Sequence, residues 1–155
     1  MAQYTVYTVG HGELSWDEFR ALLQPLGIEV LLDVRSFPYT NAAPWYNRDR
    51  LEHGVRGEGW EYLWLGALLG PLTEDGRVDY LAKETEPRYH EGIKQLMTIA
   101  GERCTCLLGG QLDPGLSHRH HLIAQTLLRH DVGVRHILAD GSLQPAQADL
   151  FHNKL

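Results

Sequence analysis

The chain has 155 residues, of which 43% are hydrophobic and 22% are charged, a composition typical of one globular domain with a single core. The formal net charge of −6 disfavours nucleic acid as a partner, because the phosphate backbone attracts basic surfaces. No apolar run approaches the roughly 18 residues of a membrane span, and the first residues have the pattern of a strand rather than of a signal peptide. We therefore expect one domain over residues 1–155, a cytoplasmic location and no membrane partner. The sequence does not specify an oligomeric state.

Hydrophobic periodicity predicts strands that alternate with helices. Ser15 and Glu18 form a capping box that begins the first helix, and Gly27 ends it. Residues 28–34 are apolar almost throughout, as in a strand that is covered on both faces. In chain order, we expect strands at residues 5–9, 28–34, 59–65, 103–108 and 134–138, helices at residues 15–26, 48–53, 87–100, 117–130 and 143–155, and irregular structure at residues 35–46 and 66–87. This order predicts the α/β class: a single-domain, three-layer Rossmann-like fold with a mostly parallel sheet.

Polar segments follow three of the expected strands. They are residues 10–12 after the first strand, residues 33–36 after the second and residues 109–119 after the fourth. Ligands of open parallel sheets bind beyond the carboxyl ends of the strands. If these three strands lie near one another in the sheet, the side chains of His11, Arg35 and Arg119 converge on one pocket.

The start of the helix after the fourth strand has the features of an anion site. Ser117 stands at the N-cap position, where a helix presents free N–H groups and the positive end of its dipole. His118 and Arg119 add hydrogen-bond donors and positive charge, and the Gly109-Gly110 pair lets a ligand approach the backbone closely. Each feature also has a structural interpretation, with Ser117 as a cap alone and Arg119 as the partner of Asp113.

Two groups of residues are candidates for the site. Because histidine titrates nearest neutral pH, the candidate catalytic acids or bases are His118 and His11. The candidate ligand-binding residues lie at the carboxyl edge or in the loop above it: Gly10, Arg35, Ser36, Tyr46, Asn47, Gly109, Gly110, Gln111, Ser117 and Arg119. Within this set, Tyr46 and Asn47 are expected to join Trp45 in a lid that covers a planar ring.

We expect no metal ion and no organic cofactor. His118 and His121 are three residues apart and could share an ion with His11, but no acidic residue has clear ligand spacing. Cys104 and Cys106 are expected to be free, buried thiols, because adjacent same-face positions on one strand rarely form a disulfide.

These motifs, in this order, resemble the bacterial family called domain of unknown function 488. The resemblance extends over nearly the whole chain and includes Gly10-His11-Gly12, Asp33-Val34-Arg35-Ser36, Tyr46-Asn47, Gly59-Trp60-Glu61-Tyr62-Leu63, Asp113-Pro114 and His118-Arg119. The family has no settled activity, so the resemblance implies the fold and the pocket rather than a reaction.

The chain departs from the family's pattern at three positions. Members often have a cysteine and a glutamate where this chain has Gly109 and Gln111, and a cysteine where it has Ser117. A cysteine at a helix start beside histidine and arginine would have a lowered pKa and would be a plausible nucleophile. Ser117 needs a strong base for that role, and Gln111 cannot take up a proton.

We therefore expect a protein that binds a small phosphorylated or nucleotide-like anion, held by Arg35, Arg119 and the helix start. An enzyme of the hydrolase or transferase type is favoured. Two alternatives stay open. One is a non-catalytic module that binds a ligand or nucleic-acid ends, which the loss of the cysteine and the glutamate favours. The other is a metal-dependent hydrolase built on the histidines.

Overall fold

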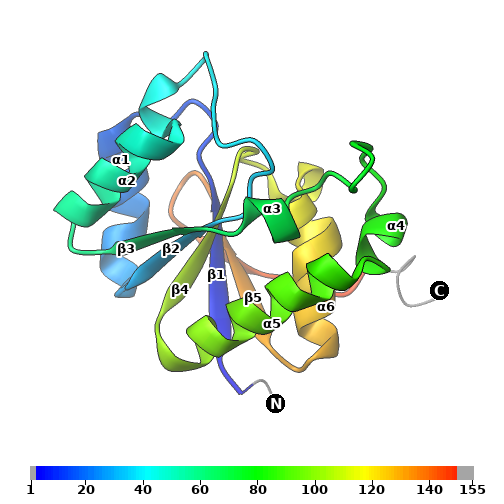
Figure 1. Ribbon diagram of the computed structural model, residues 1–155. Coiled ribbons are helices and arrows are strands. Elements are labelled where there is room, and N and C mark those ends of the chain that lie inside the picture. Colours follow the sequence, from blue (N-terminus) through cyan, green and yellow to red (C-terminus); the bar gives the residue numbers. More distant parts are fainter. Residues whose placement is uncertain (1–2, 150–155) are drawn as a thin grey trace.

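A six-stranded sheet forms the centre of the computed structural model, which describes residues 3–149 (Figure 1). The strands are β1 (Thr5–Gly10), β2 (Val30–Asp33), β3 (Glu61–Trp64), β4 (Thr105–Gly109), β5 (Gly133–Ile137) and β6 (Leu143–Pro145). Their order is β3-β2-β4-β1-β5-β6, and all neighbours are parallel except the antiparallel pair β5–β6. The chain therefore has the expected Rossmann-like α/β fold.

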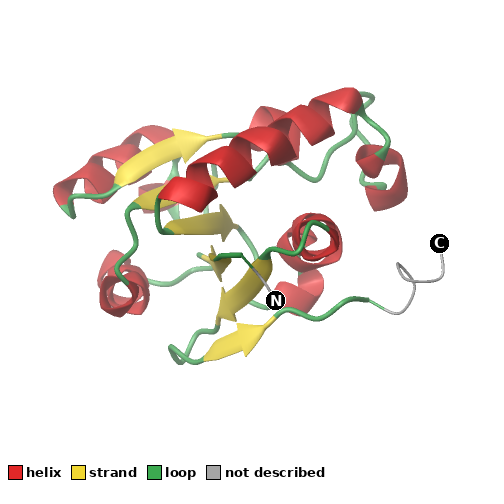
Figure 2. Cartoon of the chain, turned by 90° about the horizontal axis from the view of Figure 1, so that it is seen from below, coloured by secondary structure: helices red, strands yellow, loops and turns green. Residues whose placement is uncertain are grey.

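Helices cover both faces of this sheet, as Figures 1 and 2 show from two directions. The α-helices are α1 (Trp16–Leu23), α2 (Arg48–Gly57), α3 (Gly66–Leu69), α4 (Tyr80–Glu84), α5 (Pro87–Glu102) and α6 (Gln125–Arg129). One face carries α1 and α2, and the other carries α5 and α6 (Figure 1). Both faces of the central strands are thus removed from water, which explains why β2 and β4 are buried throughout.

The core consists of two clusters of buried side chains, one on each face of the sheet. The helices on one face contribute Phe19, Leu23, Leu51 and Val55 to their cluster. Those on the other face contribute Tyr89, Ile93, Leu96 and Leu127. Each fully buried side chain of this size stabilises the fold by about 2 kcal/mol. The two clusters therefore bury both faces of the sheet beneath the loops at its edges.

The position of β4 between β1 and β2 brings three polar segments together. Gly109 in β4 is in register with Gly10 in β1, and Leu108 is in register with Asp33 in β2. The carboxyl ends of these strands point toward the top of Figure 1, where the loops that follow them gather. The expected neighbourhood of the three strands is therefore confirmed.

Three of the expected elements differ from the structure. The helix expected over residues 143–155 is wrong over its described part, because Leu143–Pro145 forms the edge strand β6. Residues 150–155 lie outside the described part of the chain. The segment at residues 66–87, expected to be irregular, contains α3 and α4. The long helix expected at residues 117–130 begins with a π-helical turn, Arg119–Ala124, before α6.

A membrane span would need a longer and more apolar helix than any found between residues 3 and 149.

Candidate functional site

A cavity of 630 Å³ lies at the carboxyl ends of β1, β2 and β4, and we call it the carboxyl-edge cavity. Seven of the expected site residues line it: His11, Arg35, Ser36, Gly110, Gln111, Ser117 and His118. Five others do not: Gly10, Tyr46, Asn47, Gly109 and Arg119. The order of the strands in the sheet therefore brings most of the candidate residues to one cavity.

A buried ion pair fixes Arg35 in the wall of this cavity. The carboxylate of Asp33, which is fully buried, accepts hydrogen bonds from Nε and Nη2 of Arg35 at 2.9 and 2.8 Å. It also accepts a hydrogen bond from the hydroxyl of Tyr62 at 2.5 Å. Burial, followed by the nearby Asp33 charge, raises the pKa of Tyr62, so this hydroxyl stays protonated and donates. The charge of Arg35 is thus balanced within the protein.

His11 is held as a neutral ring next to this pair. Its Nδ1 lies 2.7 Å from the carbonyl of Gly12 and must donate to it, so Nε2 accepts from Nη1 of Arg35 at 3.2 Å. The ring stacks on Tyr46 with 4.5 Å between centroids. Burial, assisted by the charge of Arg35, lowers the pKa of His11 to about 4. Both nitrogens of His11 are therefore engaged, which removes it as a free acid or base in this arrangement.

His118 has one free ring nitrogen. Its Nε2 donates to the carbonyl of Val34 at 2.9 Å. Its Nδ1 has no hydrogen-bond partner among residues 3–149 and is not closed off from solvent. Burial lowers the pKa of His118 to about 4, so the ring is neutral at pH 7. His118 can therefore accept a hydrogen bond from a ligand in the carboxyl-edge cavity.

Arg119 is a buried cation that lies behind the wall of the cavity. It is fully buried, and its guanidinium donates to the Thr8 hydroxyl at 2.7 Å, the Ser117 hydroxyl at 3.2 Å and the Gln111 carbonyl at 2.5 Å. All three acceptors are neutral, and no carboxylate forms an ion pair with Arg119 within the described chain. Asp113, the partner considered from sequence, accepts from the backbone N–H of Gly115, and its charge still favours the protonated form of Arg119. Burial lowers the pKa of Arg119 to about 10, which still leaves it charged at pH 7. Arg119 was expected to contact a ligand directly, but it does not line the cavity. It supports the Gln111 backbone from behind instead.

Glycines at the strand ends make room for this guanidinium. A Cβ atom at Gly10 would lie 1.7 Å from the Gln111 carbonyl oxygen and 2.8 Å from Nη2 of Arg119. One at Gly109 would lie 2.8 Å from Cδ of Arg119. The small size of these two glycines therefore leaves space for the side chain of Arg119. From the sequence, Gly109 was expected to leave space for a ligand instead. Gly110 differs, because a Cβ atom there would meet only Nε2 of His11, at 3.8 Å.

Backbone N–H groups without an acceptor in the described part of the chain lie in the loop after β4 and at His118. The N–H of Arg119 donates to the Ser117 hydroxyl at 3.2 Å, which confirms Ser117 as a cap, and the N–H groups of His120 and His121 donate to the Ser117 carbonyl. Of the free donors expected at the helix start, only the N–H of His118 lacks an acceptor within residues 3–149. In the loop after β4, no acceptor for the N–H groups of Gly110 and Gln111 is found within the same residues. We call Gly110, Gln111 and His118 the floor of the cavity.

Apolar side chains surround the opening of the cavity. Five residues form this rim, with exposed fractions between 39% and 72%: Phe37, Tyr39, Leu72, Val78 and Leu116. The rings of Phe37 and Tyr39 lie 5.2 Å apart.

The lid expected at residues 45–47 is misplaced, because the Tyr46 hydroxyl and the Trp45 indole both donate to the Leu14 carbonyl and Tyr46 is buried. Asn47 accepts from the Thr40 backbone instead of facing a ligand. The Phe37-Pro38-Tyr39 motif, which lies in the same loop, is the part of the sequence from which the aromatic rim could have been predicted.

A second polar cluster lies outside the carboxyl-edge cavity. His120, His121 and Asp149 form the group of metal-ligating side chains that the described residues bring together. The alternative ligand set of His11, His118 and His121 is not brought together, so that version of the metal hypothesis is wrong. Sequence reasoning missed Asp149 because it lies within residues 143–155, which were expected to form a helix.

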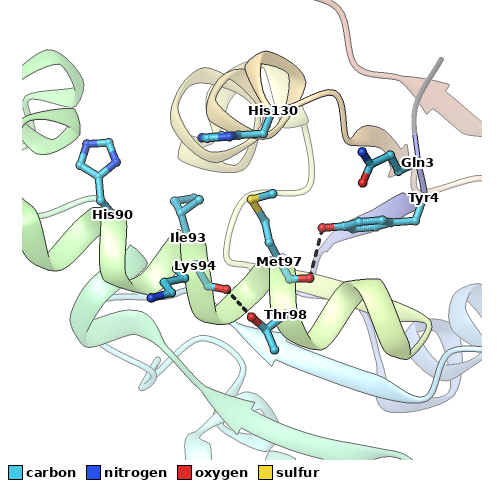
Figure 3. Close-up of a pocket in the computed structure, with 8 residues that line it drawn as sticks. All are labelled: Gln3, Tyr4, His90, Ile93, Lys94, Met97, Thr98 and His130. Carbon is cyan, nitrogen blue, oxygen red and sulfur yellow. Dashed lines mark hydrogen bonds between the residues drawn. The ribbon is translucent and has the colours of Figure 1, made fainter.

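Another hollow, of 540 Å³, lies at the opposite end of the sheet (Figure 3). Tyr4, which directly precedes β1, and Met97 in α5 line it, and the Tyr4 hydroxyl donates to the Met97 carbonyl at 3.1 Å. Lys94 and Thr98 share one side of the hollow, and His130 projects toward it from the end of α6 (Figure 3). Because ligands of parallel sheets bind at the carboxyl ends of the strands, we do not assign the site here.

The fold and the carboxyl-edge cavity define an α/β protein with a buried cation under a polar floor. The family model described as "Domain of unknown function DUF488" matches residues 15–126, so the chain belongs to this family. The match begins after His11, which places the Gly10-His11-Gly12 motif outside the matched region. Neither the curated proteins nor the solved structures include a match to the chain.

Proposed function

We propose that the carboxyl-edge cavity binds a small anionic ligand, phosphorylated or nucleotide-like, with its anion on the floor. The observation that carries this proposal is the fully buried guanidinium of Arg119, which has no carboxylate partner within residues 3–149. A buried charge without an ion-paired carboxylate is costly, and an anion on the other side of the Gln111 backbone would offset part of that cost. The free N–H groups of Gly110 and Gln111 supply the donors for such an anion.

The rim supports a ligand with a planar or apolar part. The exposed rings of Phe37 and Tyr39 stand at the opening, where they can contact a flat ring whose anionic group lies on the floor. The free Nδ1 of His118 can accept a hydrogen bond from a hydroxyl or amine of the same ligand. A phosphorylated compound with an aromatic ring fits all three features.

Catalysis of the hydrolase or transferase type would use His118 as the acceptor of a proton. A second candidate, a non-catalytic binding module, is favoured by the state of the other groups. The Ser117 hydroxyl accepts from Arg119, and within residues 3–149 it forms no hydrogen bond to a histidine that could activate it. His11 has both nitrogens engaged.

Mass spectrometry of the small molecules that co-purify with the chain tests the proposal. Gly110→Leu would place a side chain on the floor, and Gly57→Leu is the matched control, because a Cβ atom at Gly57 has nothing within 4 Å. We expect a phosphorylated compound to co-purify with the native chain and with Gly57→Leu, and to be absent from Gly110→Leu. Equal recovery from all three proteins, or recovery of no anionic compound together with no calorimetric binding of adenosine 5′-monophosphate as a probe, would reject the proposal.

A further inference from the structure

We propose that His120, His121 and Asp149 form a binding site for a divalent transition-metal ion of the zinc class. This metal cluster faces a second cavity of 550 Å³ at the side of the molecule where β6 and the segment after it lie. The second cavity shares no lining residue with the carboxyl-edge cavity. The site is therefore separate from the proposed anion site and does not depend on it.

The ligand atoms have the spacing of a coordination shell. Nε2 of His120 lies 3.0 Å from Oδ1 of Asp149, and Nδ1 of His121 lies 2.9 Å from Oδ2. All three ligand atoms lie within 4.8 Å of one another. Ligands about 2.0 to 2.1 Å from a tetrahedral zinc ion lie roughly 3.3 Å apart, so small displacements of these side chains would admit the ion.

Each histidine of the metal cluster is oriented through its other ring nitrogen. Nε2 of His121 lies 2.6 Å from the Gly115 carbonyl, and Nδ1 of His120 lies 3.1 Å from Nε2 of His136. His136 is buried in turn, and its Nδ1 lies 2.6 Å from the Thr8 hydroxyl. Metal-binding histidines characteristically have such an outer partner, which fixes the ring and the nitrogen that faces the ion.

Gln125 ties together the two segments that carry the ligands. Its amide nitrogen donates to the His120 carbonyl at 3.0 Å and to the Gln147 carbonyl at 3.2 Å, and its amide oxygen accepts from the Asp149 backbone at 2.8 Å. Gln125 is buried, so this bracket is shielded from water. Asp149 is therefore held opposite the histidines by contacts that do not involve its own carboxylate.

The ligand set selects the class of ion. Two imidazoles and one carboxylate suit Zn²⁺ and similar first-row transition ions, whereas Mg²⁺ and Ca²⁺ prefer oxygen ligands alone. His120 and Asp149 both line the second cavity, which leaves room for water or another ligand at a further coordination position. Without an ion, the same three groups form a local ion pair, and that outcome is the competing explanation.

Calorimetry of Zn²⁺ with protein treated with a chelator and then dialysed tests the proposal. We expect one ion per chain, with Mg²⁺ giving no heat of binding. Asp149→Asn and His121→Ala should each raise the dissociation constant for Zn²⁺ by about tenfold or more. His53→Ala and Asp17→Asn are the matched controls, because both side chains are exposed on other helices, and they should bind as the native chain does.

Absorption of the Co²⁺-loaded protein gives a second readout, since Co²⁺ bound by few ligands has intense visible bands. These bands should appear in the native chain and disappear in Asp149→Asn, which keeps the size of the side chain. Circular dichroism checks that each variant is folded, and if His121→Ala is not, Asp149→Asn decides. Absence of stoichiometric Zn²⁺ binding, or equal affinity in Asp149→Asn and the controls, would overturn the proposal and leave only the ion pair.

Discussion

The guanidinium of Arg119 donates to the hydroxyl of Thr8 over 2.7 Å, so a buried cation is tied to the centre of the sheet. The same guanidinium reaches the Gln111 carbonyl, and thereby links β1 to the loop that forms the floor. No carboxylate forms an ion pair with it within residues 3–149, so we expect its charge to favour an anion in the cavity above. This relationship underlies the anion-binding proposal.

The close contact at Gly10 predicts that adding one methyl group lowers the stability of the fold by a large amount. In Gly10→Ala, the new Cβ atom would lie 1.7 Å from the Gln111 carbonyl oxygen, which is backbone and cannot rotate away. We expect the free energy of unfolding, measured with urea, to fall by about 3 kcal/mol. Gly57→Ala, at the end of α2 with nothing within 4 Å, should be neutral or stabilising by up to about 1 kcal/mol. Similar unfolding free energies for the two variants would show that the loop adapts easily.

The buried pair of Asp33 and Arg35 predicts a second stability difference. Asp33→Asn removes the negative charge but leaves Arg35 in the wall with 7% of its side chain exposed. An uncompensated buried charge should lower the free energy of unfolding by about 3 kcal/mol. Asp17→Asn removes a carboxylate that is 83% exposed and pairs with Arg20, and it should change the stability by less than about 0.5 kcal/mol. A small effect of Asp33→Asn would mean that water reaches Arg35.

The low pKa of His11 predicts a loss of stability in acid. Burial lowers this pKa from 6.5 to about 4, so between these pH values the unfolded chain binds a proton at this position and the folded chain does not. Stability is therefore complete above pH 6.5 and falls toward pH 4, by about 1.4 kcal/mol per pH unit for this one group. Across this pH range, the free energy of unfolding measured with urea should change less steeply with pH in His11→Asn than in the native chain. His53→Asn, an exposed position on α2, is the control and should keep the native slope. The same dependence of stability on pH in all three proteins would contradict the low pKa of His11.

Part of the fold and site follows from sequence because it depends on local pattern. The capping box at Ser15 and the apolar run of β2 specify their elements without help from distant residues. The carboxyl ends of parallel strands meet at one edge, which is why His11 and Arg35 could be placed together.

The remainder depends on contacts between distant residues. The edge strand β6 exists because it pairs with β5, and its three residues carry no pattern of their own. Whether an arginine reaches a ligand or lies behind it depends on the space around it, and for Arg119 that space comes from Gly10 and Gly109. Asp149 meets His121 across 28 positions of sequence, which no local spacing could indicate.

The family's cysteine position predicts a reactive thiol in Ser117→Cys. The backbone N–H and Nε of Arg119 both lie 3.2 Å from the Ser117 oxygen, and together they should stabilise a thiolate with a pKa below the usual ~8.5. Iodoacetamide should modify this cysteine faster than Cys104 or Cys106, because burial raises the pKa of both native thiols. The helix should survive, with a cost of about 1 kcal/mol from the weaker cap. If the new thiol reacts no faster than a cysteine in a short peptide, covalent chemistry at this position is excluded and the binding-module candidate is favoured.

The most direct test of the anion site is a titration of the ¹⁵N-labelled chain with inorganic phosphate, followed by amide chemical shifts and compared with chloride at matched ionic strength. Phosphate binding on the floor predicts saturable shifts of the Gly110 and Gln111 amides, which have no acceptor within residues 3–149. The shifts should persist in Gly57→Leu and vanish in Gly110→Leu. Amides of Gly110 and Gln111 that do not respond to phosphate, or that respond equally to chloride, would contradict the anion site.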